Sequence, residues 1–181
     1  MRRARFWIPA NVDKDLFSRR SAPAAPLNST LVIGFGNGLR SDDGAGICAA
    51  TLVAEQSPTL RVIATPQLTP DLAEDIASAA QLVFLDAYAA PEAGASLRVE
   101  RVCGDGAGGA SAVAHHASPA ALVQLAKAIF GAAPDAWVVG IPAFSFAAGE
   151  VISPGTLHSI DEAVALIGGR ARFEDQQGGS K

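Results

Sequence analysis

The stretch LVIGFGNGLRSDDGAG, residues 31–46, indicates the fold and raises the question of function. A short apolar run passes into the turn Gly34-Phe35-Gly36, and a helix-compatible segment follows Asp42 and Asp43. A strand, a glycine-rich turn and a helix in this order are typical of an open α/β sheet, where such turns often bind phosphates. Because two adjacent carboxylates would repel a phosphate, the loop could instead hold a cation.

The rest of the chain alternates between strand and helix patterns. Apolar runs rich in Val, Ile, Leu and Phe predict strands at 31–36, 60–64, 82–88, 97–102 and 137–141, and helices are expected at 43–56, 70–80, 118–130 and 154–167. The run 97–102 alternates in polarity and is expected at a sheet edge. Three helices share a hydroxyl residue before proline at their start: Thr69-Pro70, Ser118-Pro119 and Ser153-Pro154.

This order predicts an α/β fold, a three-layer α/β/α sandwich around a mostly parallel twisted sheet, phosphorylase/hydrolase-like. The predicted domain spans residues 30–170. Residues 1–29, which are basic and then rich in Ser, Ala and Pro, are expected to form a disordered extension, and residues 171–181 a disordered tail.

Composition narrows the class of protein. The net charge is −4, but residues 1–30 hold six basic and two acidic residues, which leaves 8 basic and 16 acidic residues, or −8, for the remainder. A body this acidic is a poor nucleic-acid binder. The two cysteines form no CxxC motif, and no apolar run reaches the roughly 18–20 residues of a membrane span. We therefore expect a cytoplasmic, monomeric protein with free thiols.

Nucleotide binding and nucleophilic catalysis are poorly supported. The glycines at 34, 36 and 38 miss the GxGxxG register, which has Leu39 at its last position, and neither GK[ST] nor GxSxG occurs. Cys48 lies within a predicted helix, where a buried structural thiol is favoured, and Cys103 has no neighbouring activator.

The remaining candidates are Asp43, Asp86 and the pair His115/His116. Asp86 follows a buried apolar run, and open α/β sheets place their sites at the carboxyl ends of strands. Two carboxylates and an imidazole suit a divalent metal such as Ni²⁺ or Zn²⁺. Each of these residues also has a structural alternative. Asp42 is interpreted mainly as a helix N-cap, and Asp43 could be a first-turn residue that the helix dipole favours. Asp86 could cap a turn, and one of the two histidines could have a structural role only.

The segment GFGNGLRSDDGAG resembles the G-[IV]-G-N-x-L-x-x-D-[DE]-G-x-G signature of the hydrogenase maturation proteases. LVFLDAY, AHHASPAALVQL and WVVGIPAFSFAAGEVISP resemble later landmarks of that family in the same order, so that the likeness covers roughly 31–168. One departure is the segment Gln67-Leu68-Thr69, where the family usually has Gly-Gly-Thr. Side chains there are expected to narrow or redirect a peptide groove.

The resemblance implies an endopeptidase that removes the C-terminal extension of a [NiFe]-hydrogenase large-subunit precursor after nickel insertion. It assigns Asp43 and Asp86 as catalytic and metal-binding acids and His115 as the third ligand, with His116, Asp42 and Thr69 as further candidates. Nickel would be carried by the substrate, and Zn²⁺ or Cd²⁺ could occupy the same site. Aspartic and metal-assisted mechanisms both stay open. Alternative functions are a non-catalytic module that binds nickel or the precursor, and a nucleotide-dependent α/β enzyme.

Overall fold

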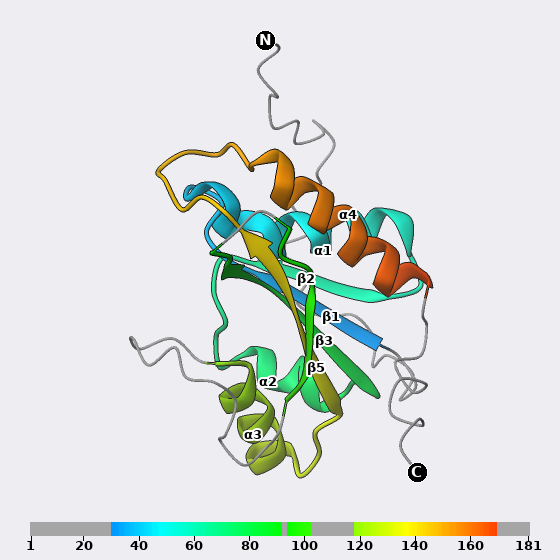
Figure 1. Cartoon of the computed structure of the whole chain (residues 1–181). Coiled ribbons are helices and arrows are strands. Elements are labelled where there is room, and N and C mark those ends of the chain that lie inside the picture. Colours follow the sequence, from blue (N-terminus) through cyan, green and yellow to red (C-terminus); the bar gives the residue numbers. More distant parts are fainter. Residues whose placement is uncertain (1–29, 92–93, 103–117, 170–181) are drawn as a thin grey trace, which may run out of the picture.

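The computed structural model describes residues 30–91, 94–102 and 118–169. Five strands and four α-helices, with the 3₁₀ helix η2 before α1, follow one another in this part of the chain (Figure 1). In order they are β1 (Thr30–Phe35), η2 (Ser41–Gly44), α1 (Ala45–Gln56), β2 (Arg61–Thr65), α2 (Leu72–Ala77), β3 (Gln81–Ala89), β4 (Arg98–Arg101), α3 (Pro119–Phe130), β5 (Asp135–Ala143) and α4 (Pro154–Gly169). Every predicted strand and helix is present, with ends shifted by a few residues.

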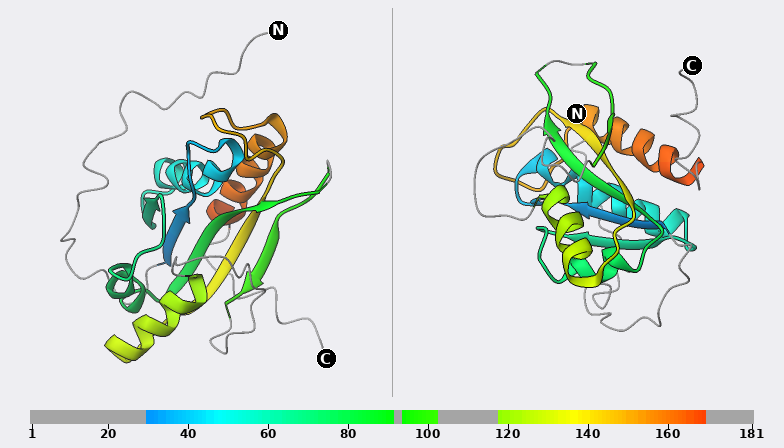
Figure 2. Two further views of the ribbon diagram at one scale, coloured as in Figure 1. Left: turned by 90° about the vertical axis from the view of Figure 1, so that its left-hand side faces the viewer. Right: turned by 90° about the horizontal axis from the view of Figure 1, so that it is seen from below.

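The strands form one twisted sheet in the order β2-β1-β3-β5-β4. The first four are parallel, and β4 pairs antiparallel with β5, as an edge strand whose four residues are all exposed. Helices α1 and α4 pack together on one face of the sheet, and α2 and α3 on the other (Figures 1 and 2). The predicted three-layer α/β/α sandwich is therefore confirmed.

Each buried strand contributes side chains to the hydrophobic cores on both faces of the sheet, because successive side chains of a strand point to opposite faces. In β3, Val83 and Leu85 join the core under α1 and α4, whereas Leu82 and Phe84 join the core over α2 and α3. All four are fully buried, which explains why the strand is apolar without alternation. Among the described residues, no helix combines the length and the apolar character needed to span a membrane.

Helices α3 and α4 begin as their serine-proline pairs predict. The Ser118 hydroxyl accepts a hydrogen bond from the Ala121 amide at 3.2 Å, and the Ser153 hydroxyl accepts one from the Thr156 amide at 3.4 Å. The third prediction was inexact, since α2 begins only at Leu72 and has no side-chain cap.

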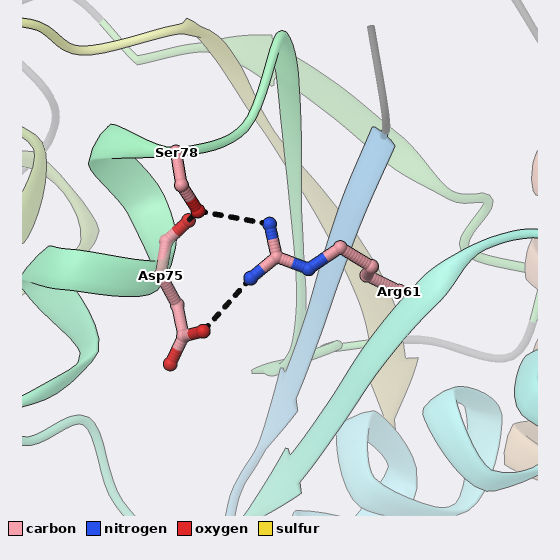
Figure 3. Close-up of polar contacts among 3 residues, drawn as sticks. All are labelled: Arg61, Asp75 and Ser78. Carbon is pink, nitrogen blue, oxygen red and sulfur yellow. Dashed lines mark hydrogen bonds and ion pairs between the residues drawn. The ribbon is translucent and has the colours of Figure 1, made fainter. Parts of the chain in front are cut away.

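A polar contact fixes the end of α2 against the sheet instead. The guanidinium of Arg61 on β2 donates to the Asp75 carboxylate at 2.8 Å and to the Ser78 hydroxyl at 2.9 Å (Figure 3). Ser78 is the C-cap of α2, and the helix dipole also favours a cation at this end of the helix.

Helix α1 approaches the sheet very closely at Gly46. A Cβ atom at this position would lie 2.3 Å from the carbonyl oxygen of Phe35 and 2.4 Å from that of Leu85. Both obstacles are backbone atoms of β1 and β3, which cannot rotate away. The first turn of α1 thus rests directly on the carboxyl ends of these two strands.

We expect Gly46→Ala to lower the free energy of unfolding by at least about 1–3 kcal/mol, because the added methyl group must displace backbone. Gly169→Ala at the end of α4 is the matched control, since a Cβ there meets no atom within 4 Å. Urea unfolding of both variants measures the difference, and equal stability would show that α1 can move away from the sheet without penalty.

Candidate functional site

The two predicted acids lie near the carboxyl end of the sheet, one in the segment that follows β1 and one on the neighbouring strand β3. Asp43 lies in η2, after β1, and Asp86 lies within β3, which pairs with β1. Burial and, to a lesser extent, the negative charge of Asp43 raise the pKa of Asp86 to about 6, against the effect of a hydrogen bond from the Ala87 backbone. The structure thus brings Asp43 and Asp86 close enough to interact electrostatically, as the sequence predicts.

Asp42, adjacent to Asp43 in sequence, is fully buried and accepts four hydrogen bonds. Its Oδ2 accepts from the backbone amides of Phe144 and Ser145, at 2.8 and 2.9 Å, and from the Ser153 hydroxyl at 2.8 Å. Its Oδ1 accepts from the Ser153 amide at 2.6 Å. The carboxylate therefore ties the loop after β1 to the loop after β5 and to the start of α4.

These bonds make Asp42 a buried anion. Burial alone would raise the pKa of its carboxyl group, but hydrogen bonds from Ser153 and Phe144 outweigh that effect and hold the pKa below the usual value. The interpretation of Asp42 as the N-cap of the first helix was wrong: α1 begins at Ala45, its N-cap is Gly44, and no side chain caps it. The donors to Asp42 lie 102–111 residues away in sequence.

Further contacts join the same two loops. The Ser41 amide donates to the Gly149 carbonyl at 2.7 Å, the Gly149 amide donates to the Leu39 carbonyl at 2.9 Å, and the Ser41 hydroxyl donates to the Val151 carbonyl. Gly36 lets the chain turn towards them: its φ is +140°, and a Cβ atom would lie 2.0 Å from the Asp43 carbonyl oxygen. The glycine turn after β1 thus delivers Asp42 inward and leaves Asp43 only partly buried.

The side chains of Gln67, Leu68 and Thr69, which follow β2, were expected to narrow or redirect a peptide groove. The structure differs from this expectation at Leu68. Leu68 is buried in the core against α2 and α3, so that its side chain does not occupy a surface groove. Gln67 is exposed, and its carbonyl accepts a hydrogen bond from the Thr65 hydroxyl at 2.9 Å. Thr69 is half-buried beside them. Any narrowing at this segment must come from Gln67.

The predicted histidine ligands, His115 and His116, lie outside the described residues, as does Cys103. Within the described part of the chain, no three His, Cys, Asp or Glu side chains gather in a group able to hold a metal ion. Cys48 does not have the character of a nucleophile, because burial, with the charges of Asp161 and Glu55, raises its pKa to about 11. Of the predicted metal ligands, Asp43 and Asp86 are thus the two that lie within the described residues.

Comparison with solved structures identifies the fold as that of the hydrogenase maturation proteases. The [NiFe] hydrogenase maturation protease HycI from Thermococcus kodakarensis KOD1 matches 78% of this chain over 91% of its own, with 18% identity and a TM-score of 0.65. HybD from Thermococcus kodakarensis matches 80% of this chain over 99% of its own, with 21% identity and a TM-score of 0.57. The hydrogenase maturating endopeptidase HybD from E. coli matches 77% over 89%, with 20% identity and a TM-score of 0.57.

These likenesses confirm the fold class predicted from the order of strands and helices, and they agree with the family that the sequence motifs resemble. No protein-family model matches the sequence. No curated protein matches it either. At identities near 20%, the shared architecture is a likeness of fold, and the activity has to be argued from the residues of the site.

We expect Asp42→Asn to lower the free energy of unfolding by about 2–4 kcal/mol, although the side chains have nearly the same shape. All four groups around Asp42 donate, and an amide would turn one NH₂ group towards them. Because the pKa of Asp42 is lowered on folding, its contribution is present above the unfolded value of 3.8 and is lost as pH falls through the folded value. Urea unfolding at pH 7 and pH 3, with the exposed Asp71→Asn as control, measures both effects.

We expect Asp86→Asn to stabilise the metal-free protein at pH 7. The folded pKa of about 6 exceeds the ordinary 3.8, so that wild-type stability falls as pH rises through that interval. The shift corresponds to roughly 3 kcal/mol as an upper limit. Thermal unfolding in EDTA should show a higher Tm for the variant at pH 7 and a smaller difference near pH 4. A difference independent of pH would contradict the assignment.

Proposed function

We propose that this protein is an endopeptidase that removes the C-terminal extension of a [NiFe]-hydrogenase large-subunit precursor after nickel insertion. The observation that carries the proposal is the pairing of Asp43 and Asp86 at the carboxyl edge of this particular fold. Solved structures with the same fold include maturation proteases of [NiFe] hydrogenases. The sequence signature around Asp43 supports the same function independently of the structure.

In this proposal nickel is part of the substrate. Asp43 and Asp86 would recognise an ion that the precursor already holds, with His115 as a third protein ligand. Two partly buried carboxylates favour a cation between them, because its charge would offset both the burial and the repulsion by Asp43 that raise the pKa of Asp86. The donor set of carboxylate oxygens and imidazole suits a divalent ion of nickel or zinc type, and Cd²⁺ is a practical probe.

The proposed chemistry needs a base close to neutral pH. On the aspartic route, in which Asp86 does not ligate the ion, a pKa of about 6 leaves Asp86 largely ionised at pH 7 yet able to accept a proton, which suits activation of the attacking water in peptide hydrolysis. Asp43 would keep Asp86 in this state and orient the cation. When bound, the nickel ion would supply electrostatic stabilisation of the carbonyl oxygen under attack.

Processing of a nickel-loaded precursor, followed by mass spectrometry, tests the proposal. The wild type should release the C-terminal extension only from the nickel-loaded form. Asp43→Asn and Asp86→Asn should each reduce the cleavage rate by about 100-fold or more, since each removes a charged ligand or base. Asp71→Asn, on the exposed surface, should leave the rate unchanged.

Parallel His115→Ala and His116→Ala variants identify the third ligand, because only the ligand's loss should slow cleavage. Wild-type rates in the Asp43, Asp86 and His115 variants together would show that the site assignment is wrong. Binding of the nickel-loaded precursor without any change of its mass would instead support a non-catalytic binding module.

A further inference from the structure

A cleft of about 370 Å³ opens beside the candidate site. Its walls come from the loop after β1, the first turn of α1, the end of β2 and the loop before α4, and its lining includes Leu39, Ile47, Cys48, Pro66, Glu150 and Ile152. The lining is predominantly apolar, with Glu150 as its ionisable carboxylate. None of the roles assigned above to Asp42, Asp43 or Asp86 uses this cleft.

The strand order relates the cleft to the two acids. Asp86 lies on β3, on one side of β1, whereas Pro66 follows β2, on the other side. Ser41 and Gly44, which flank the two aspartates in η2, also line the cleft. Two strand spacings separate β3 from β2, or about 10 Å, which an extended peptide crosses in about three residues. A peptide held at Asp43 and Asp86 can therefore reach the cleft along the carboxyl edge of the sheet.

Exposed apolar side chains gather on the same loops. Leu39, Val151 and Phe144 are exposed by 66%, 58% and 36%, and they lie on the two loops that Asp42 joins. Large apolar side chains that are exposed to solvent do not stabilise a monomer, and contiguous patches of them mark binding sites. Leu39 lines the cleft and Val151 lies between the lining residues Glu150 and Ile152, so that these two side chains extend its apolar surface.

The charges around the cleft favour a basic partner. The two loops beside the cleft carry the acids Asp42, Asp43 and Glu150 and one basic residue, Arg40. Within the described ranges, Glu150 takes part in no ion pair. An apolar side chain inside a basic peptide segment matches both the lining of the cleft and the sign of its surroundings.

We propose that this cleft is a specificity site that receives an apolar side chain of the precursor, about three residues from the cleaved bond, with a basic neighbour facing Glu150. The inference rests on the proposed endopeptidase function and adds the chemical class of the sequence that the enzyme selects. Filling one apolar pocket is worth about 10–200-fold in discrimination, which a rate measurement resolves readily.

Gly38→Leu tests the cleft directly. Gly38 lines it, and a Cβ atom at this position meets no atom within 4 Å, so that the larger side chain enters open space. KM for a nickel-loaded precursor should rise by about tenfold or more, while kcat stays within about twofold. Gly169→Leu is the matched control, since its Cβ also meets no atom but lies at the end of α4. An unchanged KM in Gly38→Leu would overturn the inference.

Substitutions in the precursor test the occupant. Each position within about four residues of the cleaved bond is replaced by Leu and by Asp. One position about three residues away should prefer Leu in the wild type and lose that preference in Gly38→Leu. Glu150→Lys should weaken cleavage of precursors with a basic neighbour at that position, whereas the exposed Glu74→Lys should not.

The outcomes separate the inference from the proposed function. If the wild type cleaves the precursor but shows no positional preference, the inference fails and the proposed function stands. If the wild type cleaves no nickel-loaded precursor, both fail. If light scattering shows dimers that Gly38→Leu dissociates, the cleft holds a second copy of this chain, and that result also overturns the inference.

Discussion

The charge of one buried carboxylate holds the functional end of this molecule together. Asp42 has no solvent to stabilise it, and an ionised group in such a place is tolerable only when donors replace the lost water. Three backbone amides and one hydroxyl do so, and all of them belong to the loop after β5 or to the residue that caps α4. The Ser153 hydroxyl also lies 3.1 Å from that of Thr156, which donates to the Pro142 carbonyl, so that the network reaches the end of β5 itself.

Burial of Asp42 also explains the position of its neighbour. In the tight 3₁₀ turn Ser41–Gly44, two successive side chains cannot point the same way, so anchoring Asp42 inward directs Asp43 outward. On the far side, Gly46 allows α1 to settle on the carbonyl oxygens of Phe35 and Leu85, which keeps the turn close to β3. Asp43 thus lies near Asp86 because of the hydrogen bonds of Asp42 and the close packing at Gly46, and not because of contacts that the two acids make themselves.

The sequence alone predicted the features that depend on local patterning. Apolar runs located all five strands, and the serine-proline pairs located two helix starts. Asp86 was expected at the end of its strand, whereas β3 continues to Ala89 and Asp86 lies just beyond the part of β3 that pairs with β1. The role of Asp42 could not be predicted in this way, because its donors lie more than 100 residues away and a carboxylate just before a helix has an ordinary local explanation as a cap. Leu68 was misjudged for a similar reason: in sequence it occupies a segment between elements, whereas in space it belongs to the core.

The raised pKa of Asp86 reflects its burial and, to a lesser extent, the nearby negative charge of Asp43. An acid that is buried beside another acid destabilises the folded state at neutral pH, and a fold keeps such a pair only if surrounding contacts hold it in place. The Asp42 network supplies those contacts, so that the repulsion between Asp43 and Asp86 can persist without spreading the loops apart. In the proposed function, a cation that arrives with the precursor would bind acids that are already positioned, so that little binding free energy would be lost to ordering the loops. The hydrogen bonds of Asp42 therefore stabilise the folded state, whereas the neighbouring charges of Asp43 and Asp86 destabilise it. The first effect offsets the second.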